Sequence, residues 1–160
     1  MAGLNLSHSF RDVTLSVGSW KTVASWRAPG GGGTNDQMVR LSSLKLASNG
    51  QSGDSEALGI RLARVQAGTG TATTQTPQKV NNALSAVPRS ICKVNFTAEP
   101  TDDGTSPYLF EDKFHPQGGN VQNWEFDEFI VKEGTEVAVQ LMVPTGGTAV
   151  KVSGHLIGEE

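Results

Sequence analysis

Hydrophobic and polar residues alternate along much of the chain with the two-residue period of a β-strand. The clearest case is Val137, Val139, Leu141 and Val143, which are separated by residues that are mostly polar or small. Such alternation is typical of a strand with one buried and one exposed face, and no segment shows sustained helical periodicity. The pattern therefore predicts an all-β protein. The other strands that it predicts are residues 13–17, 20–26, 38–46, 58–65, 91–97, 108–114 and 121–131.

The last two strands are predicted to form a hairpin. Residues 144–147 read Pro-Thr-Gly-Gly, which favours a turn, and Val150 and Val152 then alternate with polar residues. Met142 and Ile157 fall on the face of this hairpin that the alternation leaves exposed. Because exposed apolar surface often marks an interface, we expect the chain to form a homo-oligomer.

Turn-forming residues divide the chain into short segments. It contains 19 glycines and 7 prolines, which suits short strands joined by turns. No helices are available to connect parallel strands, so neighbouring strands should be antiparallel. The apolar pattern shifts by one residue between Leu41 and Leu44, which indicates a β-bulge or a bend, and residues 68–77 are expected to be a loop. The predicted fold is a single antiparallel jelly-roll sandwich of about eight strands over residues 12–160, with a lipocalin-like barrel as the alternative.

Charge and composition exclude several classes of protein. The formal net charge is −3, with 13 basic and 16 acidic side chains interspersed among 160 residues. A nucleic-acid-binding protein needs a cluster of Lys and Arg on one face, and the sequence has none, so no nucleic-acid partner is expected. No apolar run is long enough to span a membrane, and the first residues lack a secretory signal, so we expect synthesis in the cytoplasm. Cys92 lies in an alternating strand and is predicted to be a buried structural thiol.

Residue types that carry chemistry are dispersed along the chain. His8, His115 and His155 are far apart and no His-x-His pair occurs, so no metal site is predicted. The glycines at 30–33 are followed by neither a lysine nor a helix, and so do not form a phosphate-binding loop. The adjacent carboxylates at 111–112 should point to opposite faces of a strand. We therefore predict no catalytic residue, no cofactor and no enzymatic activity.

Three tryptophans suggest an alternative function. Trp20 and Trp26 are six residues apart, so both would face the same side of an unbroken strand, and Trp124 is the third. A row of exposed aromatic rings would offer a surface for stacking sugars, whereas most large aromatic side chains in a small sandwich belong to the core. A glycan- or receptor-binding module of a tail or adhesion protein is therefore the alternative.

One local sequence is more specific than these features, namely Phe-His-Pro-Gln-Gly-Gly at residues 114–119. It follows Thr-Ala-Glu-Pro at 97–100 and precedes Trp-Glu-Phe at 124–126 and Ile-Val-Lys-Glu-Gly at 130–134, and the chain ends in Leu-Ile-Gly-Glu-Glu. This order resembles a group of small virion proteins of tailed bacteriophages. Because the shared motifs are turns rather than a catalytic signature, the resemblance bears on fold and context more than on mechanism.

The resemblance implies a jelly-roll protein of the virus particle, specifically a capsid decoration or cement protein that binds and stabilises the major capsid shell. Proteins of this kind form homo-oligomers, often trimers, that clamp adjoining shell subunits. The implied partners are therefore further copies of this chain and the shell protein, and the implied location is the capsid surface of the virion. The chain departs from the group in a longer acidic loop at 99–112 and in its glycines at 30–33, which leaves the partner surface open.

The motif at 114–119 is predicted to determine the shape of a turn rather than to react. Proline fixes φ and disfavours helical geometry in the residue before it, while glycine tolerates positive φ. Such a turn would connect the strands at 108–114 and 121–131. The residues assigned to it are His115, Pro116, Gln117, Gly118 and Gly119.

Residues 1–11 are predicted to form an N-terminal docking arm that precedes the first strand. The segment is mostly polar and carries Leu4, Leu6 and Phe10 as isolated apolar anchors. A disordered tail is the alternative for the same segment, because chain ends are often poorly ordered.

Overall fold

Twelve β-strands and no helix make up the part of the chain that the computed structural model describes, so the prediction of an all-β antiparallel protein is confirmed. In this part no helix is long and apolar enough to cross a membrane. The described residues are 4–30, 38–49, 56–81, 85–104, 107–117, 120–123 and 129–160. The strands are β1 (Asn5–Thr14), β2 (Trp20–Arg27), β3 (Val39–Ser48), β4 (Leu58–Val65), β5 (Thr71–Gln75), β6 (Gln78–Lys79), β7 (Ile91–Ala98), β8 (Tyr108–Phe114), β9 (Asn120–Asn123), β10 (Phe129–Val131), β11 (Glu136–Met142) and β12 (Lys151–Glu159).

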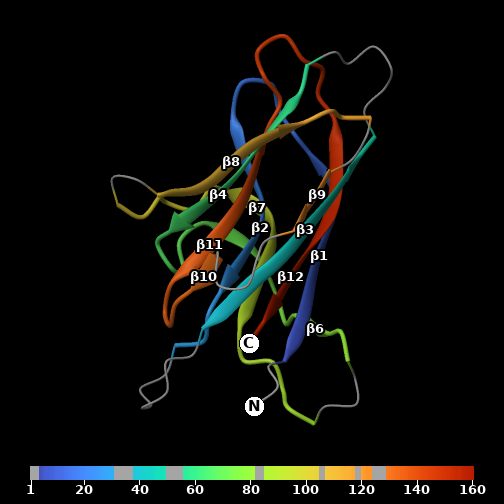
Figure 1. Ribbon diagram of the computed structural model, residues 1–160. Coiled ribbons are helices and arrows are strands. Elements are labelled where there is room, and N and C mark those ends of the chain that lie inside the picture. The colour runs from blue at the N-terminus through green and yellow to red at the C-terminus, as the bar shows by residue number, and fades with distance from the viewer. Residues whose placement is uncertain are drawn as a thin grey trace.

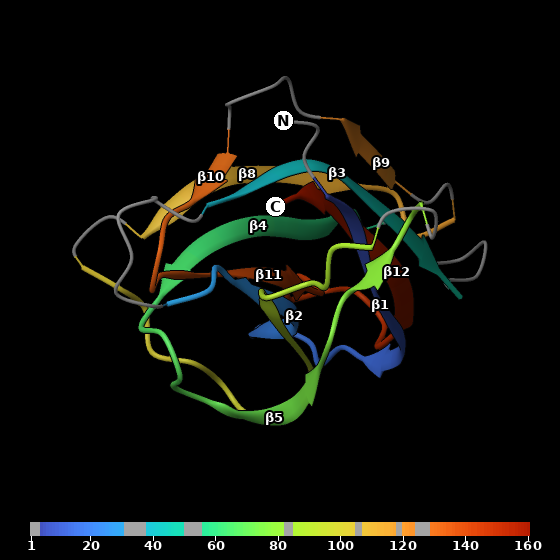
Figure 2. The same cartoon turned by 90° about the horizontal axis from the view of Figure 1, so that it is seen from below.

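The strands form two antiparallel sheets that face each other (Figures 1 and 2). The first sheet has the order β10-β3-β12-β1-β6, with β9 also paired to β3, and the second has the order β5-β7-β2-β11-β4-β8. Strand pairing is nested along the chain: β1 pairs with β12, β2 with β11, β3 with β10, and β4 with β8. Most pairs therefore join segments that are far apart in the sequence.

A hydrophobic core lies between the two sheets and draws on both. Leu6 and Leu156 come from the first sheet, Leu62 and Leu141 from the second, and all four are fully buried in the same cluster. Directly opposite residues of an antiparallel pair lie on the same face. The odd-numbered apolar residues of β11 therefore face this core, and its even-numbered residues, from Glu136 to Met142, lie on the outer face of the second sheet.

The predicted C-terminal hairpin is wrong, because β11 and β12 lie in different sheets. β11 pairs with β2 and β4 in the second sheet, whereas β12 pairs with β1 and β3 in the first. The turn after β11, in which the backbone N–H groups of Gly146 and Gly147 donate to the Pro144 carbonyl, carries the chain from one sheet to the other. Met142 and Ile157 are half-buried residues of different sheets, and so do not form one exposed apolar face.

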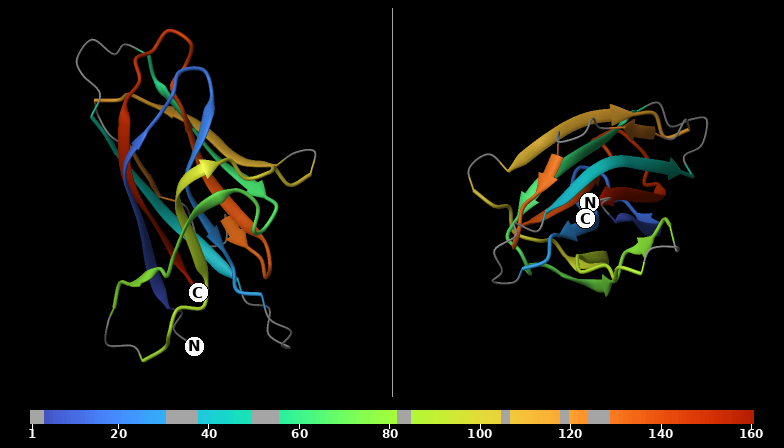
Figure 3. Two further views of the ribbon diagram at one scale, coloured as in Figure 1. Left: turned by 180° about the vertical axis from the view of Figure 1, so that it is seen from behind. Right: turned by 60° about the horizontal axis from the view of Figure 1, so that its bottom comes forward.

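The docking-arm prediction is also wrong for the residues from Leu4 onward. β1 pairs with β12 along its length, and Leu4 exchanges backbone hydrogen bonds of 2.8 and 3.0 Å with Glu160 at one end of the molecule (Figures 1 and 3). Leu4, Leu6 and Phe10 are 7%, 0% and 2% exposed and belong to the core. These three residues all have even numbers, as expected for one face of a strand. His8 lies on the same face and is buried as well, but it is polar and so breaks the apolar pattern. Residues 1–3 lie outside the described residues.

A strand that the sequence pattern missed closes one side of the molecule. Residues 68–77, expected to be a loop, contain β5, which pairs with β7 at the edge of the second sheet. The next strand, β6, pairs with β1 in the first sheet, so this segment passes from one sheet to the other (Figure 2). Its side chains are small and polar, so no hydrophobic alternation marked it as a strand. The predicted strand at 121–131 corresponds to β9 and β10, and residues 124–128 between them lie outside the described residues.

Candidate functional site

A β-bulge places Trp20 and Trp26 on opposite faces of β2. Val23 has no partner on β11, because Ala24 pairs with Val139 and Thr22 with Gln140. Even-numbered residues before this bulge therefore lie on the opposite face of β2 from even-numbered residues after it. Trp26 is fully buried in the core, whereas Trp20 lies opposite Met142 on the outer face of the second sheet. The predicted row of tryptophans on one face is therefore wrong, and Trp124 lies outside the described residues.

Trp20 belongs to a stack of three side chains on this outer face. The guanidinium carbon of Arg61 lies 4.2 Å from the centroid of the Trp20 ring and 4.1 Å from that of the Tyr108 ring. The Arg61 Nε–H also donates to Gln140 Oε1 at 2.6 Å. The two rings cover the guanidinium, leaving Arg61 only 9% exposed, and cation–π attraction holds the indole in one orientation.

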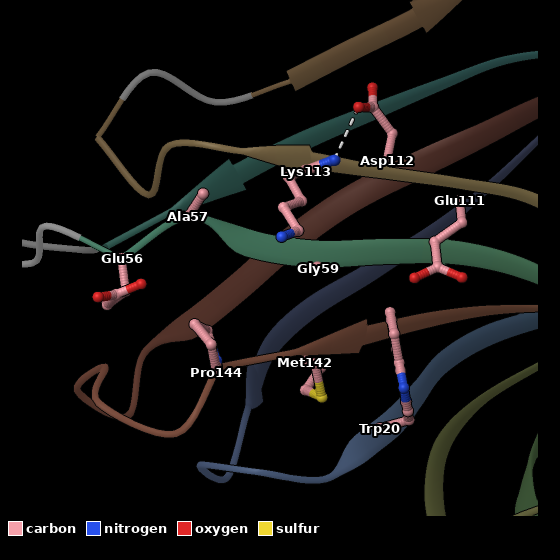
Figure 4. A pocket seen from close by; sticks show the side chains of 9 residues that line it. All are labelled: Trp20, Glu56, Ala57, Gly59, Glu111, Asp112, Lys113, Met142 and Pro144. Carbon is pink, nitrogen blue, oxygen red and sulfur yellow. Dashed lines mark hydrogen bonds between the residues drawn. The ribbon is translucent and has the colours of Figure 1, made fainter.

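A groove of about 540 Å³ lies beside Trp20 (Figure 4). β4 runs along its middle, β8 along one side, and β11 with β2 along the other. Gly59 of β4 is essential to its shape, because a Cβ at this position would lie 3.0 Å from the Trp20 ring. The absence of a side chain thus allows the indole to reach across β11 to β4. The groove is lined by Trp20, Glu56, Ala57, Gly59, Glu111, Asp112, Lys113, Met142 and Pro144.

The polar side chains of the groove have unused hydrogen-bonding capacity. Glu56, Glu111 and Lys113 are exposed, and their charged groups form no hydrogen bond or ion pair with another described residue. Asp112 differs, because its carboxylate turns away from the groove (Figure 4) and accepts a 2.9 Å hydrogen bond from Gln122 Nε2 of β9. The two adjacent carboxylates therefore do not face one site, as the alternation of a strand predicts.

A second polar cluster on the outer face is buried and fully paired. The Glu136 carboxylate is 0% exposed and accepts hydrogen bonds from Ser25 Oγ at 2.5 Å and from the Gly68 backbone N–H at 3.0 Å. Lys93 forms an ion pair with it at 3.1 Å and donates to the Thr69 carbonyl at 3.3 Å. These contacts fix the connection between β4 and β5 over the sheet. The cluster thus positions the segment that leads into β5, and it leaves no group free for a ligand.

The two edges of the second sheet differ in charge. The β8 edge carries three consecutive charged residues, Glu111, Asp112 and Lys113. The β5 edge carries none, and residues 66–78 contain no charged side chain. Charged residues on an edge strand discourage pairing with another chain. Among the described residues no strand pairs with the outer edge of β5, so this edge is open to strand addition.

The segment at 115–119 leads from β8 in the second sheet to β9 in the first. Pro116 and Gln117 form a turn, and the Gln117 backbone N–H donates to His115 Nδ1 at 3.2 Å. The Pro116 carbonyl accepts a 2.7 Å hydrogen bond from Ser48 Oγ, which ties the turn to the end of β3. Gly118 and Gly119, also assigned to this turn, lie outside the described residues.

Two titratable side chains are buried in the core. Cys92 is fully buried, as predicted, and burial raises the pKa of its thiol far above the usual range, with the negative charges of Glu136 and Glu160 adding to the effect. The neutral thiol is a poor nucleophile. The His8 ring is 2% exposed, and its Nε2–H donates to the Lys93 carbonyl at 3.2 Å. Burial lowers the pKa of His8.

The burial of His8 predicts a loss of stability in acid. A group whose pKa is lower in the folded state stabilises the protein fully above its unfolded pKa, about 6.5 for histidine, and loses this contribution as the pH falls. The free energy of unfolding should therefore decrease below about pH 6.5, with a slope from this residue of at most about 1.4 kcal/mol per pH unit. Urea unfolding of the parent and of His8→Gln between pH 5 and 7.5 isolates this slope. Equal slopes in the two proteins would show that His8 does not titrate on unfolding.

The sequence contains one signal for the groove. Gly59 interrupts an alternating strand, and a glycine inside a strand often marks the close approach of another group. Among the residues that the structure describes, no group of three or more His, Cys, Asp or Glu side chains could hold a metal ion. Comparison of the chain with protein-family models, with curated proteins and with solved structures gives no match.

Proposed function

We propose that this chain is a structural protein of a tailed-bacteriophage virion, a decoration or cement protein that binds the outside of the major capsid shell and stabilises it. The observation that carries the proposal is the open, uncharged edge of β5 in a sheet whose other edge is protected by charge. An assembling protein needs such a site of attachment, whereas a freely soluble monomer avoids one. The sequence resemblance around residues 114–119 supports the same context.

The strand pairing supports a jelly-roll fold for this protein. In a jelly roll eight strands are divided between two sheets, and this architecture is common in viral capsid and lectin domains. The orders β1-β12-β3-β10 and β2-β11-β4-β8 give eight strands in which the first pairs with the last and each inner pair is nested within it. β5, β6 and β7 then extend the margins of the two sheets.

Strand addition at β5 would supply both strength and specificity to the attachment. A neighbouring strand would pair with the free N–H and C=O groups of the β5 edge, as in other cases of β-augmentation. Several copies on one particle would act together, because each contact raises the effective concentration of the next. The proposed state in solution is a homo-oligomer, with a trimer favoured, and light scattering at micromolar concentration measures its mass.

Thr74→Glu is expected to lower binding to the particle at least about ten-fold, because it places a charge on the edge that would pair. Thr74 is exposed and opposite Lys93, so the substitution should leave the folded chain intact. The measurement is co-sedimentation with heads of the source phage that lack this protein, followed by electron cryomicroscopy of the complex.

Glu111→Gln is the matched control, since it alters the other edge of the same sheet and should bind as the parent does. Parent-like binding of Thr74→Glu would exclude the β5 edge as the contact. A parent protein that neither sediments with the heads nor adds density to their surface would disprove the decoration role itself.

A further inference from the structure

We propose that the groove beside Trp20 binds a saccharide that carries no acidic group. This binding activity goes beyond attachment to the capsid shell and uses different residues, because the groove lies at the β8 side of the second sheet and β5 at its other edge. Saccharide binding and attachment to the shell can therefore be tested separately, and loss of one does not imply loss of the other.

The indole of Trp20 provides the stacking surface. Arg61 and Tyr108 lie on the side of the stack away from the groove, since neither lines it. The groove thus borders a part of the indole that the guanidinium does not cover. The missing side chain at Gly59 leaves room for the ring, and Arg61 holds it there before any ligand arrives. A preorganised ring costs little conformational entropy on binding. The C–H face of a pyranose ring stacks on such a surface.

The charged groups of the groove match the hydroxyl groups of a sugar. The carboxylates of Glu56 and Glu111 can accept hydrogen bonds, and the Lys113 ammonium can donate them. Two carboxylates against one ammonium leave the rim negative, so uronic and sialic acids would be repelled. Met142 and Pro144 add apolar surface. A mostly apolar site with a few polar groups and a volume between ~300 and 1,000 Å³ is typical of small-ligand binding.

An extended peptide fits this groove less well than a saccharide. Peptide recognition by strand addition requires a free backbone edge. β4, in the middle of the groove, is already paired with β11 on one side and β8 on the other. A ligand in the groove therefore meets polar side chains and no unpaired backbone groups of β4. Such side chains can bind the hydroxyl groups of a sugar.

The test is binding of the labelled parent chain to a printed array of neutral, amino and acidic saccharides, with affinities then measured by titration of tryptophan fluorescence. We expect binding to at least one neutral or amino saccharide and none to the acidic ones. The double variant Glu56→Gln with Glu111→Gln should bind at least about ten-fold more weakly, since hydrogen bonds to charged groups are the stronger ones. Asp12→Asn is the matched control, because this exposed carboxylate lies on β1 of the other sheet and does not line the groove, and it should bind within about two-fold of the parent.

Unfolding midpoints of all variants establish that they are folded. Failure to bind any neutral or amino saccharide, or a preference for acidic ones, would overturn the proposal. Equal affinity of the parent and the double variant would overturn it as well, since the sugar would then bind elsewhere. Binding to a peptide array but to no saccharide would reject the proposal, and loss of that peptide binding in the double variant would identify the groove as a peptide site.

Discussion

Replacing Glu136 by alanine is expected to lower the free energy of unfolding by about 3–5 kcal/mol, because the change breaks a buried ion pair by removing one partner. The Lys93 ammonium, 12% exposed, would lose its counter-ion. Ser25 Oγ and the Gly68 N–H would lose their acceptor in the same cluster, and each unpaired buried group adds a desolvation cost. Urea unfolding followed by tryptophan fluorescence measures the loss as a lower midpoint with an unchanged slope.

Two further variants test whether the loss of stability comes from breaking the buried ion pair or from removing any carboxylate. Glu111→Ala removes an exposed carboxylate that pairs with no other described residue, and should change stability by no more than about 0.5 kcal/mol. Replacing both Glu136 and Lys93 by methionine should recover much of the loss, since apolar side chains of similar volume replace a buried ion pair at little cost. If Glu136→Ala were as mild as Glu111→Ala, the carboxylate would not be holding the β4–β5 connection.

Local features of the fold could be predicted from the sequence because they depend on neighbouring residues alone. The strands predicted at 58–65 and 108–114 coincide with β4 and β8. The bulge predicted between Leu41 and Leu44 is confirmed, since the register with β12 leaves Ser42 as an extra residue. In each case the alternation or its interruption lies within one strand, and the face that turns inward is the apolar one.

Pairing between strands could not be predicted in the same way. The inner faces of two stacked sheets present the same alternation, so Val139 and Val152 look alike in sequence although they belong to different sheets. The turn after β11 therefore predicts a hairpin, whereas in the structure it connects the second sheet to the first. In β1 the buried His8 interrupts the apolar alternation, so the pattern predicts isolated anchors at Leu4, Leu6 and Phe10 where the structure has a strand.

The groove depends on features that no single segment encodes. Trp20 faces it only because the bulge at Val23 reverses the faces of β2. The indole then reaches Gly59 only because β2, β11 and β4 are neighbours in this order. The sequence predicts Trp20 and Trp26 together as candidate sugar-stacking residues. The structure leaves only Trp20 beside the groove, since Trp26 lies in the core.

Gly154→Ala is expected to lower the free energy of unfolding by about 3 kcal/mol, at the upper end of the usual cost of overpacking. Gly154 lies in β12 between Phe10 of β1 and Leu46 of β3, and faces the core. A Cβ at this position would lie 2.8 Å from Phe10 Cζ and 3.0 Å from Leu46 Cδ2, and closer still to the Lys45 carbonyl oxygen. The side chains could move, but the carbonyl belongs to the backbone of the paired strand, so relief requires β3 and β12 to separate locally.

The cause of this loss can be identified with two more variants. Gly146→Ala places the same methyl group in an exposed turn, where the nearest atom would be 4.0 Å away, and should leave stability within about 0.5 kcal/mol of the parent. Adding Phe10→Leu to Gly154→Ala removes the ring contact but not the contact with the Lys45 carbonyl. If the backbone contact dominates, the double variant will be no more stable than Gly154→Ala. A Gly154→Ala protein with the parental unfolding midpoint would show that β12 and β3 are not packed as closely as their register implies.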